Sequence, residues 1–226
     1  MQGISPTDIR EIDTCDMTPP DIQRSAWNSR YLRSGRQWGN APSEFSLTPN
    51  VGVILEAGVG DGKNLRVRPD QGEMVMGFDF AESAIRLCRA DPTLTHVHLF
   101  IGDLRAVPLK RDSVDLIYAH HILGHLDEKD LGTAIQEVSR ILKPAGSIAL
   151  TVFSQYDMRY NSRKQNDSGI VIRGDGIITR FFTFQEIRVL FENFSEVFLN
   201  RNQWSLKVRG VEHVRSVITG LYKKSF

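Results

Sequence analysis

The stretch VGVILEAGVGDGK, residues 51–63, decides the fold because it joins an apolar run to a glycine-rich turn. Val51–Ala57 is almost wholly apolar, which predicts a short buried strand. Gly58, Gly60 and Gly62 follow at once. Glycine lets the backbone adopt positive φ and approach a ligand closely. We therefore expect a strand, a ligand-binding turn and a helix in direct succession.

Apolar runs and helical segments alternate through the rest of the chain. Further strands are predicted over residues 74–78, 96–100, 114–118 and 147–153, with helices over 81–90 and 127–142. Apolar strands separated by helices are typical of a parallel sheet covered on both faces. The last two apolar segments, 195–204 and 211–222, have no helix between them and should pair antiparallel at one edge. The predicted fold class is α/β, with seven strands, mostly parallel.

The spacing of the glycines separates two classes of cofactor. A dinucleotide site would place its third glycine at position 63, which is Lys63 here. Asp61 would also put a negative charge near a pyrophosphate, so charge and spacing both disfavour NAD. Asp79 closes the second strand, where a carboxylate can accept both hydroxyl groups of a ribose.

Four motifs occur in order along the chain: Glu56-x-Gly58-x-Gly60-x-Gly62, Asp79, GDL at 102–104 and ILKPAG at 141–146. Together they resemble the motifs of class I S-adenosylmethionine-dependent methyltransferases. The resemblance spans about residues 51–153, and the closing antiparallel pair also fits it. It implies a Rossmann-like methyltransferase sheet, S-adenosylmethionine as cofactor and S-adenosylhomocysteine as product.

The resemblance also assigns roles in cofactor binding. Gly58 and Gly60 would line the methionine part, with Glu56 near its ammonium group and Ala119 near the sulfonium. On the adenosine side, the implied residues are Asp79 for the ribose, Phe80 for the adenine face, Asp103 for the exocyclic amine and the backbone N–H of Leu104 for the ring.

Three histidines follow the fourth strand in YAHHILGHL, residues 118–126. His120 and His121 are candidate catalytic residues, because a histidine can act as a general base near neutral pH. Local packing is the alternative and stays open. His121 and His125 could share a helical face, but no third ligand has suitable spacing, so we predict no metal site.

Two segments should cover the acceptor side. Residues 1–50 are predicted to form an N-terminal lid, and residues 51–226 the cofactor-binding domain with a lid-like insertion at 155–180. The segment that begins at Ala26 resembles the lead-in of small-molecule methyltransferases of the tellurite-resistance type. It implies that Arg30 meets the cofactor carboxylate and that Tyr31 closes on the site as a third catalytic candidate. A solvated basic helix with Tyr31 in the core is the alternative.

Composition bounds the partners. The chain has 226 residues, with 28 Lys and Arg against 27 Asp and Glu, so its formal net charge is +1. This balance argues against nucleic acid as a partner. Cys15 and Cys88 are too few for a disulfide scaffold. No apolar run approaches the length of a membrane span, and the acidic start does not resemble a signal peptide, so we expect no membrane contact and a cytoplasmic protein.

The sequence thus favours a methyltransferase that acts on a small-molecule acceptor by in-line transfer, in which positioning does most of the work. The mildly basic insertion suggests an anionic acceptor. Methylation of RNA or protein through the arginine-rich lid is the alternative within the fold. A nucleotide-binding module or an NAD(P)-dependent oxidoreductase is the alternative from another class. A monomer and a homodimer are both compatible with the chain.

Overall fold

The computed structural model describes residues 19–37, 52–66, 73–161 and 169–225. It is an α/β structure whose sheet has nine strands within these ranges. The strands are β1 (Val53–Ala57), β2 (Met74–Asp79), β3 (His98–Ile101), β4 (Val114–His120), β5 (Leu142–Ser154), β6 (Ile170–Ile172), β7 (Ile178–Phe182), β8 (Phe194–Val208) and β9 (Val211–Lys224). The longer helices are α1 (Pro19–Ser34), α3 (Glu82–Arg89), α4 (Glu128–Ile141) and α6 (Phe184–Leu190). Short turns are α2 (Lys63–Arg66), η3 (Pro92–Leu94), η4 (Ile122–His125) and α5 (Met158–Asn161).

The five predicted parallel strands pair in the order β3-β2-β1-β4-β5. β9 then pairs antiparallel with β5 and with β8, which confirms the predicted C-terminal pair. The count of seven strands is too low, because β6 and β7 come from the insertion at 155–180. β7 pairs with Phe153 and Ser154 beyond the end of β4 and so lengthens the sheet there.

The two faces of the sheet are covered by different helices. Neighbouring residues on β2 show the alternation: Val75 packs in a cluster with α3, and Met76 packs against the cluster that contains α4. α4 begins at Asp127, whose side chain accepts a hydrogen bond from the Asp130 N–H, as its sequence predicts. Its apolar stripe, including Leu131, is buried.

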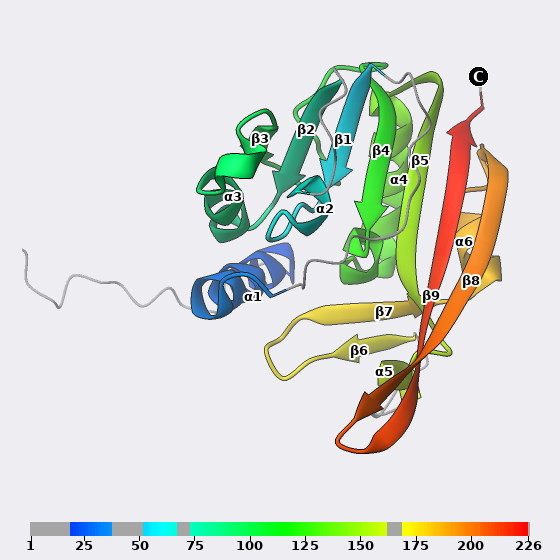
Figure 1. The fold of residues 1–226 in the computed structure, drawn as a ribbon. Helices are drawn as coiled ribbons and strands as arrows, with labels where there is room; N and C mark the ends of the chain where they lie inside the picture. Colours follow the sequence, from blue (N-terminus) through cyan, green and yellow to red (C-terminus); the bar gives the residue numbers. More distant parts are fainter. Residues whose placement is uncertain (1–18, 38–51, 67–72, 162–168, 226) are drawn as a thin grey trace, which may run out of the picture.

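α1 lies across the carboxyl ends of β1 and β2, next to β6 and β7 (Figure 1). Gln23 holds α1 in this position through the nitrogen and the oxygen of its side-chain amide. Its Nε2 donates to the Gly176 carbonyl at 2.8 Å, and its Oε1 accepts from the Ile178 N–H at 3.0 Å. On the other side, Asn28 bonds the N–H and hydroxyl of Ser83 at the start of α3.

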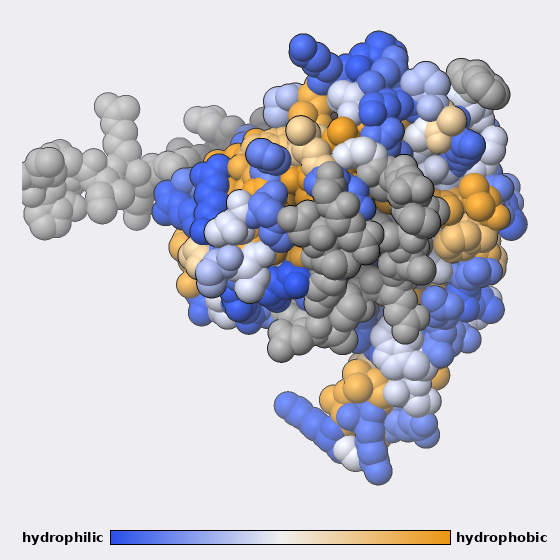
Figure 2. Space-filling view, turned by 45° about the horizontal axis from the view of Figure 1, so that its top comes forward, coloured by the Kyte–Doolittle hydropathy of each residue, from blue (hydrophilic) through white to orange (hydrophobic). Residues whose placement is uncertain are grey.

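The β8–β9 hairpin projects beyond the sheet (Figure 1). Its outer half exposes apolar side chains among hydrophilic ones, which Figure 2 shows at the projecting end. The exposed apolar residues there are Trp204, Leu206, Val208, Val211 and Val214. No helix within the described ranges is long and apolar enough to cross a membrane.

Replacement of Gln23 by Ala should loosen α1. The change removes two hydrogen bonds of about 1 kcal/mol each and leaves the Gly176 carbonyl and the Ile178 N–H without their partner. We expect hydrogen exchange of the α1 amides to become at least about tenfold faster. Leu32→Ala, at an exposed position of the same helix, is the control. Equal protection in the two variants would contradict this role of Gln23.

Candidate functional site

A pocket of about 870 Å³ lies at the carboxyl ends of the parallel strands. Its walls come from the glycine-rich turn, the ends of β2 to β5, helix α1, the η4 turn, the β6–β7 pair and the β8–β9 hairpin. This is where open α/β sheets bind their ligands.

The glycine-rich turn is held to the end of β2 by Asp79. The carboxylate is buried and accepts the N–H of Gly60 and the N–H of Ala81, each at 2.9 Å. Burial raises the pKa of Asp79 to about 6, against the opposing effect of these hydrogen bonds. Gly58 lies beside it with φ +72°, and a Cβ there would come within 3.0 Å of Ile122. The turn therefore needs glycine at position 58 and presents its backbone to the pocket.

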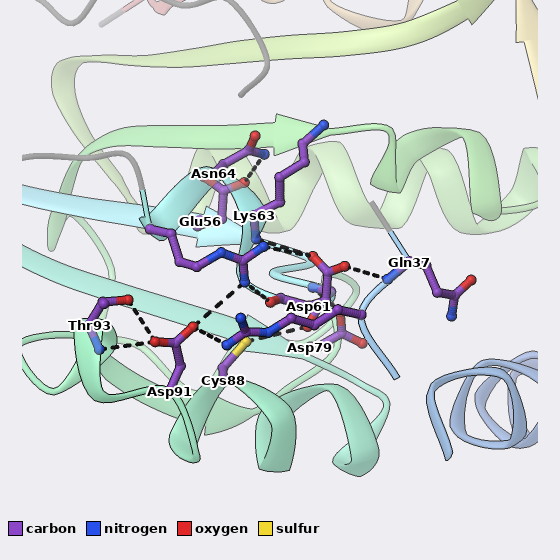
Figure 3. A network of polar contacts seen from close by, with 12 residues as sticks. Gln37, Glu56, Asp61, Lys63, Asn64, Asp79, Cys88, Asp91 and Thr93 are labelled. Carbon is purple, nitrogen blue, oxygen red and sulfur yellow. Dashed lines mark hydrogen bonds and ion pairs between the residues drawn. The ribbon is translucent and has the colours of Figure 1, made fainter. Parts of the chain in front are cut away.

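Glu56 and Asp61 form hydrogen bonds around the turn, as Figure 3 shows. Glu56 is buried and accepts from the Asn64 amide at 3.1 Å, and it does not line the pocket. Asp61 accepts the backbone N–H groups of Gln37 at 2.8 Å and Lys63 at 3.2 Å. Asp61 thereby ties the chain that follows α1 to the glycine-rich turn, a role that the sequence did not predict.

The predicted adenosine-binding residues lie together. Phe80, Asp103 and Leu104 line the pocket beside Asp79. Arg105 holds the Asp103 carboxylate by an ion pair of 2.5 Å and also bonds Asp130. Burial would raise the pKa of Asp103, but the hydrogen bonds from Arg105 outweigh it and lower this pKa, so the carboxylate is ionised.

The histidines that follow β4 differ in their surroundings. His120 lies with Nδ1 3.2 Å from the Thr151 hydroxyl. The backbone of His121 adopts a left-handed conformation with φ 61°, and its imidazole ring stacks on the Phe153 ring with centroids 4.1 Å apart. His125 bonds the Ile178 carbonyl through Nδ1 at 2.6 Å, and burial lowers its pKa to about 4. The expected shared helical face of His121 and His125 is wrong, because η4 starts only after the left-handed residue. All three line the pocket.

α1 brings only part of the predicted lid contacts to the pocket. Tyr31 is buried, stacks on Trp27 at 5.7 Å and lines the pocket with it. Arg30 instead pairs with Asp175 in the β6–β7 turn at 2.7 Å and is not part of the lining. Its predicted contact with a cofactor carboxylate has no support in this geometry. Ala119 is buried in β4 and also does not line the pocket.

Parts of the predicted lid fall outside the described residues. These are Cys15 and most of residues 1–50, including Trp38 to Ser43, and residues 162–168 of the insertion. The division at residue 50 stays a prediction. Cys88 is buried, and its Sγ donates to the Gly60 carbonyl at 3.4 Å.

A second group of residues was missed by the sequence analysis, and of this group Arg159, Trp204 and Arg215 line the pocket. Asp157 is fully buried and binds Nε of Arg159 at 2.7 Å and Nε of Arg215 at 2.8 Å. Burial would raise the pKa of Asp157, but the bonds from the two arginines lower it. Trp204 packs against Arg215, 5.6 Å from its guanidinium. The β8–β9 pairing creates this cluster, because Trp204 lies directly opposite Arg215.

Known methyltransferases resemble this chain in sequence and in fold. The family model described as a methyltransferase domain matches residues 55–150. A solved S-adenosylmethionine-dependent methyltransferase from Anabaena variabilis has a TM-score of 0.70 at 15% identity and covers 92% of this chain and 96% of its own. A methyltransferase from Burkholderia thailandensis, solved with bound S-adenosylhomocysteine, has a TM-score of 0.56 at 17% identity, over 91% of this chain and 79% of its own.

Several curated relatives are tRNA-modifying enzymes. The human tRNA N(3)-cytidine methyltransferase METTL2B is 31% identical over 161 residues, which is 66% of this chain and 43% of the relative. The METTL2 enzyme of Danio rerio is 29% identical over 153 residues, 62% of this chain and 43% of its own. The chain therefore spans less than half the length of these relatives.

These relatives contradict two predictions. The expected small-molecule acceptor is wrong, and so is the argument from balanced charge against a nucleic acid partner. The net charge of +1 averages over the chain, whereas Arg159, Arg173 and Arg215 all line the pocket. No comparison bears on the tellurite-resistance-type N-terminal segment, which stays a prediction.

Cofactor affinity should depend on the ionisation of Asp79. The ionised carboxylate accepts ribose hydroxyls better than the protonated form does, so affinity for S-adenosylmethionine should fall by up to about tenfold per pH unit below pH 6. Calorimetry from about pH 5 to about pH 8 tests this, because that range spans the ionisation of Asp79. Asp79→Asn should bind weakly with no such pH dependence, because the amide oxygen can satisfy only one of the two backbone donors. Glu82→Gln, at an exposed ion pair on α3, is the control. A flat profile for the unmodified protein would refute the assignment.

Proposed function

We propose that this chain, whose residues 55–150 match a methyltransferase domain, is a class I S-adenosylmethionine-dependent methyltransferase that methylates N3 of a cytidine in tRNA. The match of residues 55–150 to the methyltransferase domain supports the predicted enzyme class, and with it S-adenosylmethionine as the cofactor. The acceptor rests mainly on one observation. The similarity to METTL2B extends over 161 residues and thus beyond the segment that the family model matches.

The residues of the pocket suit the cofactor. The Asp79 and Asp103 carboxylates offer acceptors for hydroxyl and amino groups, and Phe80 offers an apolar side chain. Gly58 has a positive φ and lies close to Ile122, so the turn has no Cβ at this position and can bring its backbone against the methionine part. When bound, S-adenosylmethionine supplies a methyl group already activated by its sulfonium.

The acceptor end of the pocket has the side chains that an RNA nucleotide requires. Arg159 and Arg215 share the buried charge of Asp157, which leaves this cluster of three groups with a net charge of +1. Trp204 exposes 46% of its surface at the start of the projecting hairpin. Guanidinium groups bind phosphates, and aromatic rings stack on unpaired bases. The local charge therefore supports an anionic polymer although the whole chain is nearly neutral.

The chemistry of N3 also fits the site. The N3 atom lies on the Watson–Crick edge, so the target base must be unpaired to enter the pocket. N3 of neutral cytosine carries a lone pair and no proton, so its attack on the methyl group needs no general base. Burial lowers the pKa values of His121 and His125, so both rings are neutral near pH 7 and suit binding and orientation.

Incubation of the protein with unmodified tRNA and labelled S-adenosylmethionine tests this function. We expect 3-methylcytidine in the digested RNA, identified by mass spectrometry against standards for the other methylated nucleosides. A transcript in which the modified cytidine is changed to uridine is the control and should take up no label at that site. Methylation of another base, or of protein only, would overturn the proposal.

Loss of Arg215 should weaken RNA binding selectively. Arg215→Gln removes one cationic group at the acceptor end, so tRNA affinity should fall about three- to tenfold. The slope of the logarithm of the binding constant against the logarithm of salt concentration should also become shallower by about one. Affinity for S-adenosylmethionine should stay unchanged. Arg188→Gln, at an exposed arginine of α6 paired with Glu196, is the matched control. Equal tRNA affinity of both variants would exclude Arg215 from the RNA site.

A further inference from the structure

His121 is held more firmly than its place after a strand requires. Its backbone N–H donates to the Thr151 carbonyl at 2.7 Å, and its carbonyl accepts from Gly124 at 3.1 Å. A left-handed φ of 61° is unfavourable for a histidine, because its Cβ crowds the following carbonyl. The surrounding structure keeps this conformation, and such residues cluster at ligand sites.

The imidazole ring is also fixed in orientation. His121 stacks on Phe153 at 4.1 Å with an interplanar angle of 18°, and the guanidinium of Arg159 lies 3.7 Å from the centre of the same ring. Two groups this close to the ring centre must occupy opposite faces. Arg159 is anchored by Asp157, which is fully buried and also holds Arg215. The sandwich of His121, Phe153 and Arg159 therefore leaves the histidine little rotational freedom.

The two ring nitrogens of His121 differ. Nδ1 is closed off from solvent and has no hydrogen-bond partner among the described residues. His121 lines the pocket, so Nε2 is the nitrogen that a ligand can reach. A proton on Nδ1 would be a buried donor without an acceptor, which is costly. The neutral ring is therefore expected to carry its proton on Nε2 and to present a donor to the pocket.

His125 shows the opposite arrangement a turn away. Its Nδ1 lies 2.6 Å from the Ile178 carbonyl, which can only accept, so Nδ1 carries the proton there. Burial is the main cause that lowers the pKa of His121 well below 6.5, and His120, His125, Arg159 and Lys63 add to it by repulsion. The pocket thus holds two neutral histidines with opposite proton positions.

We propose that His121 donates a hydrogen bond from Nε2–H to a carbonyl oxygen on the methyl acceptor, next to the atom that is methylated. Under the tRNA function proposed above, on which this identification rests, the carbonyl is O2 of the target cytosine. O2 is adjacent to N3, so a fixed donor there directs the N3 lone pair into the pocket. Adenine has no carbonyl beside its N1, so the same donor selects cytosine over adenine.

The position of the proton is tested on the protein alone. Nitrogen NMR of histidine-labelled protein, assigned with His121→Asn, should show an unprotonated Nδ1 and a protonated Nε2 at neutral pH. The signals of His125 should show the reverse. A proton on Nδ1 of His121, or a charged ring, would overturn the inference whether or not the protein methylates tRNA.

The contact is tested by kinetics with three RNA substrates. One carries cytidine at the target, one carries an aminopyridine nucleoside that keeps the ring nitrogen and amino group but lacks the carbonyl, and one lacks only the amino group. His121→Gly, which relieves the left-handed strain, should lower kcat/KM about tenfold on cytidine and leave cofactor affinity unchanged. The same variant should cause no further loss on the substrate without the carbonyl, and the full loss on the substrate without the amino group.

His121→Asn keeps an N–H donor and tolerates a left-handed backbone, so it should recover part of the activity. His98→Asn, at an exposed position of β3, is the matched control and should behave like the unmodified protein. An equal loss in His121→Gly on all three substrates would mean that the residue has only a structural role. No methylation of any tRNA by the unmodified protein would refute the proposed function, and the NMR measurement would still decide on His121.

Discussion

The Asp79 carboxylate joins the two elements on which the cofactor half of the site depends. It bonds Gly60 in the turn after β1 and Ala81 at the start of α3, both at 2.9 Å. A buried carboxylate is costly unless it is hydrogen-bonded, and these two backbone donors offset part of that cost. The raised pKa of Asp79 shows that the compensation is incomplete. The remaining acceptor capacity of the carboxylate is what a ribose with two hydroxyls can use.

The grouping of the proposed cofactor-binding residues was predictable because they are local in sequence. A strand end, a glycine turn and the next strand end place Gly58, Gly60 and Asp79 together with no knowledge of the rest of the chain. Asp103 and Leu104 follow from the parallel pairing of β2 and β3, since parallel strands end at one edge. The same logic does not reach Arg30, whose partner Asp175 lies 145 residues away.

The proposed acceptor half was not predictable because it depends on pairing between distant segments. β7 takes its place beside β5 only after the insertion has folded back, and it then supplies the Ile178 carbonyl that holds His125. Arg215 meets Asp157 across 58 residues, through the register of β8 with β9 and of β9 with β5. Composition misled for the same reason. A sum of charges over the chain does not show that four arginines line one pocket.

The carboxylates and guanidinium groups discussed above come from different elements of the pocket, and this arrangement is compatible with the proposed transfer to a neutral nitrogen. Asp79 ends β2 and Asp103 follows β3, whereas Arg159 comes from α5 and Arg215 from β9. Methylation of N3 moves a positive charge from the sulfonium to the base, so no proton has to leave before the bond forms. A charged histidine beside the sulfonium would oppose binding of the cofactor, whereas burial keeps His121 and His125 neutral. The histidines can therefore lie next to the transferred methyl group and contribute hydrogen bonds without adding charge.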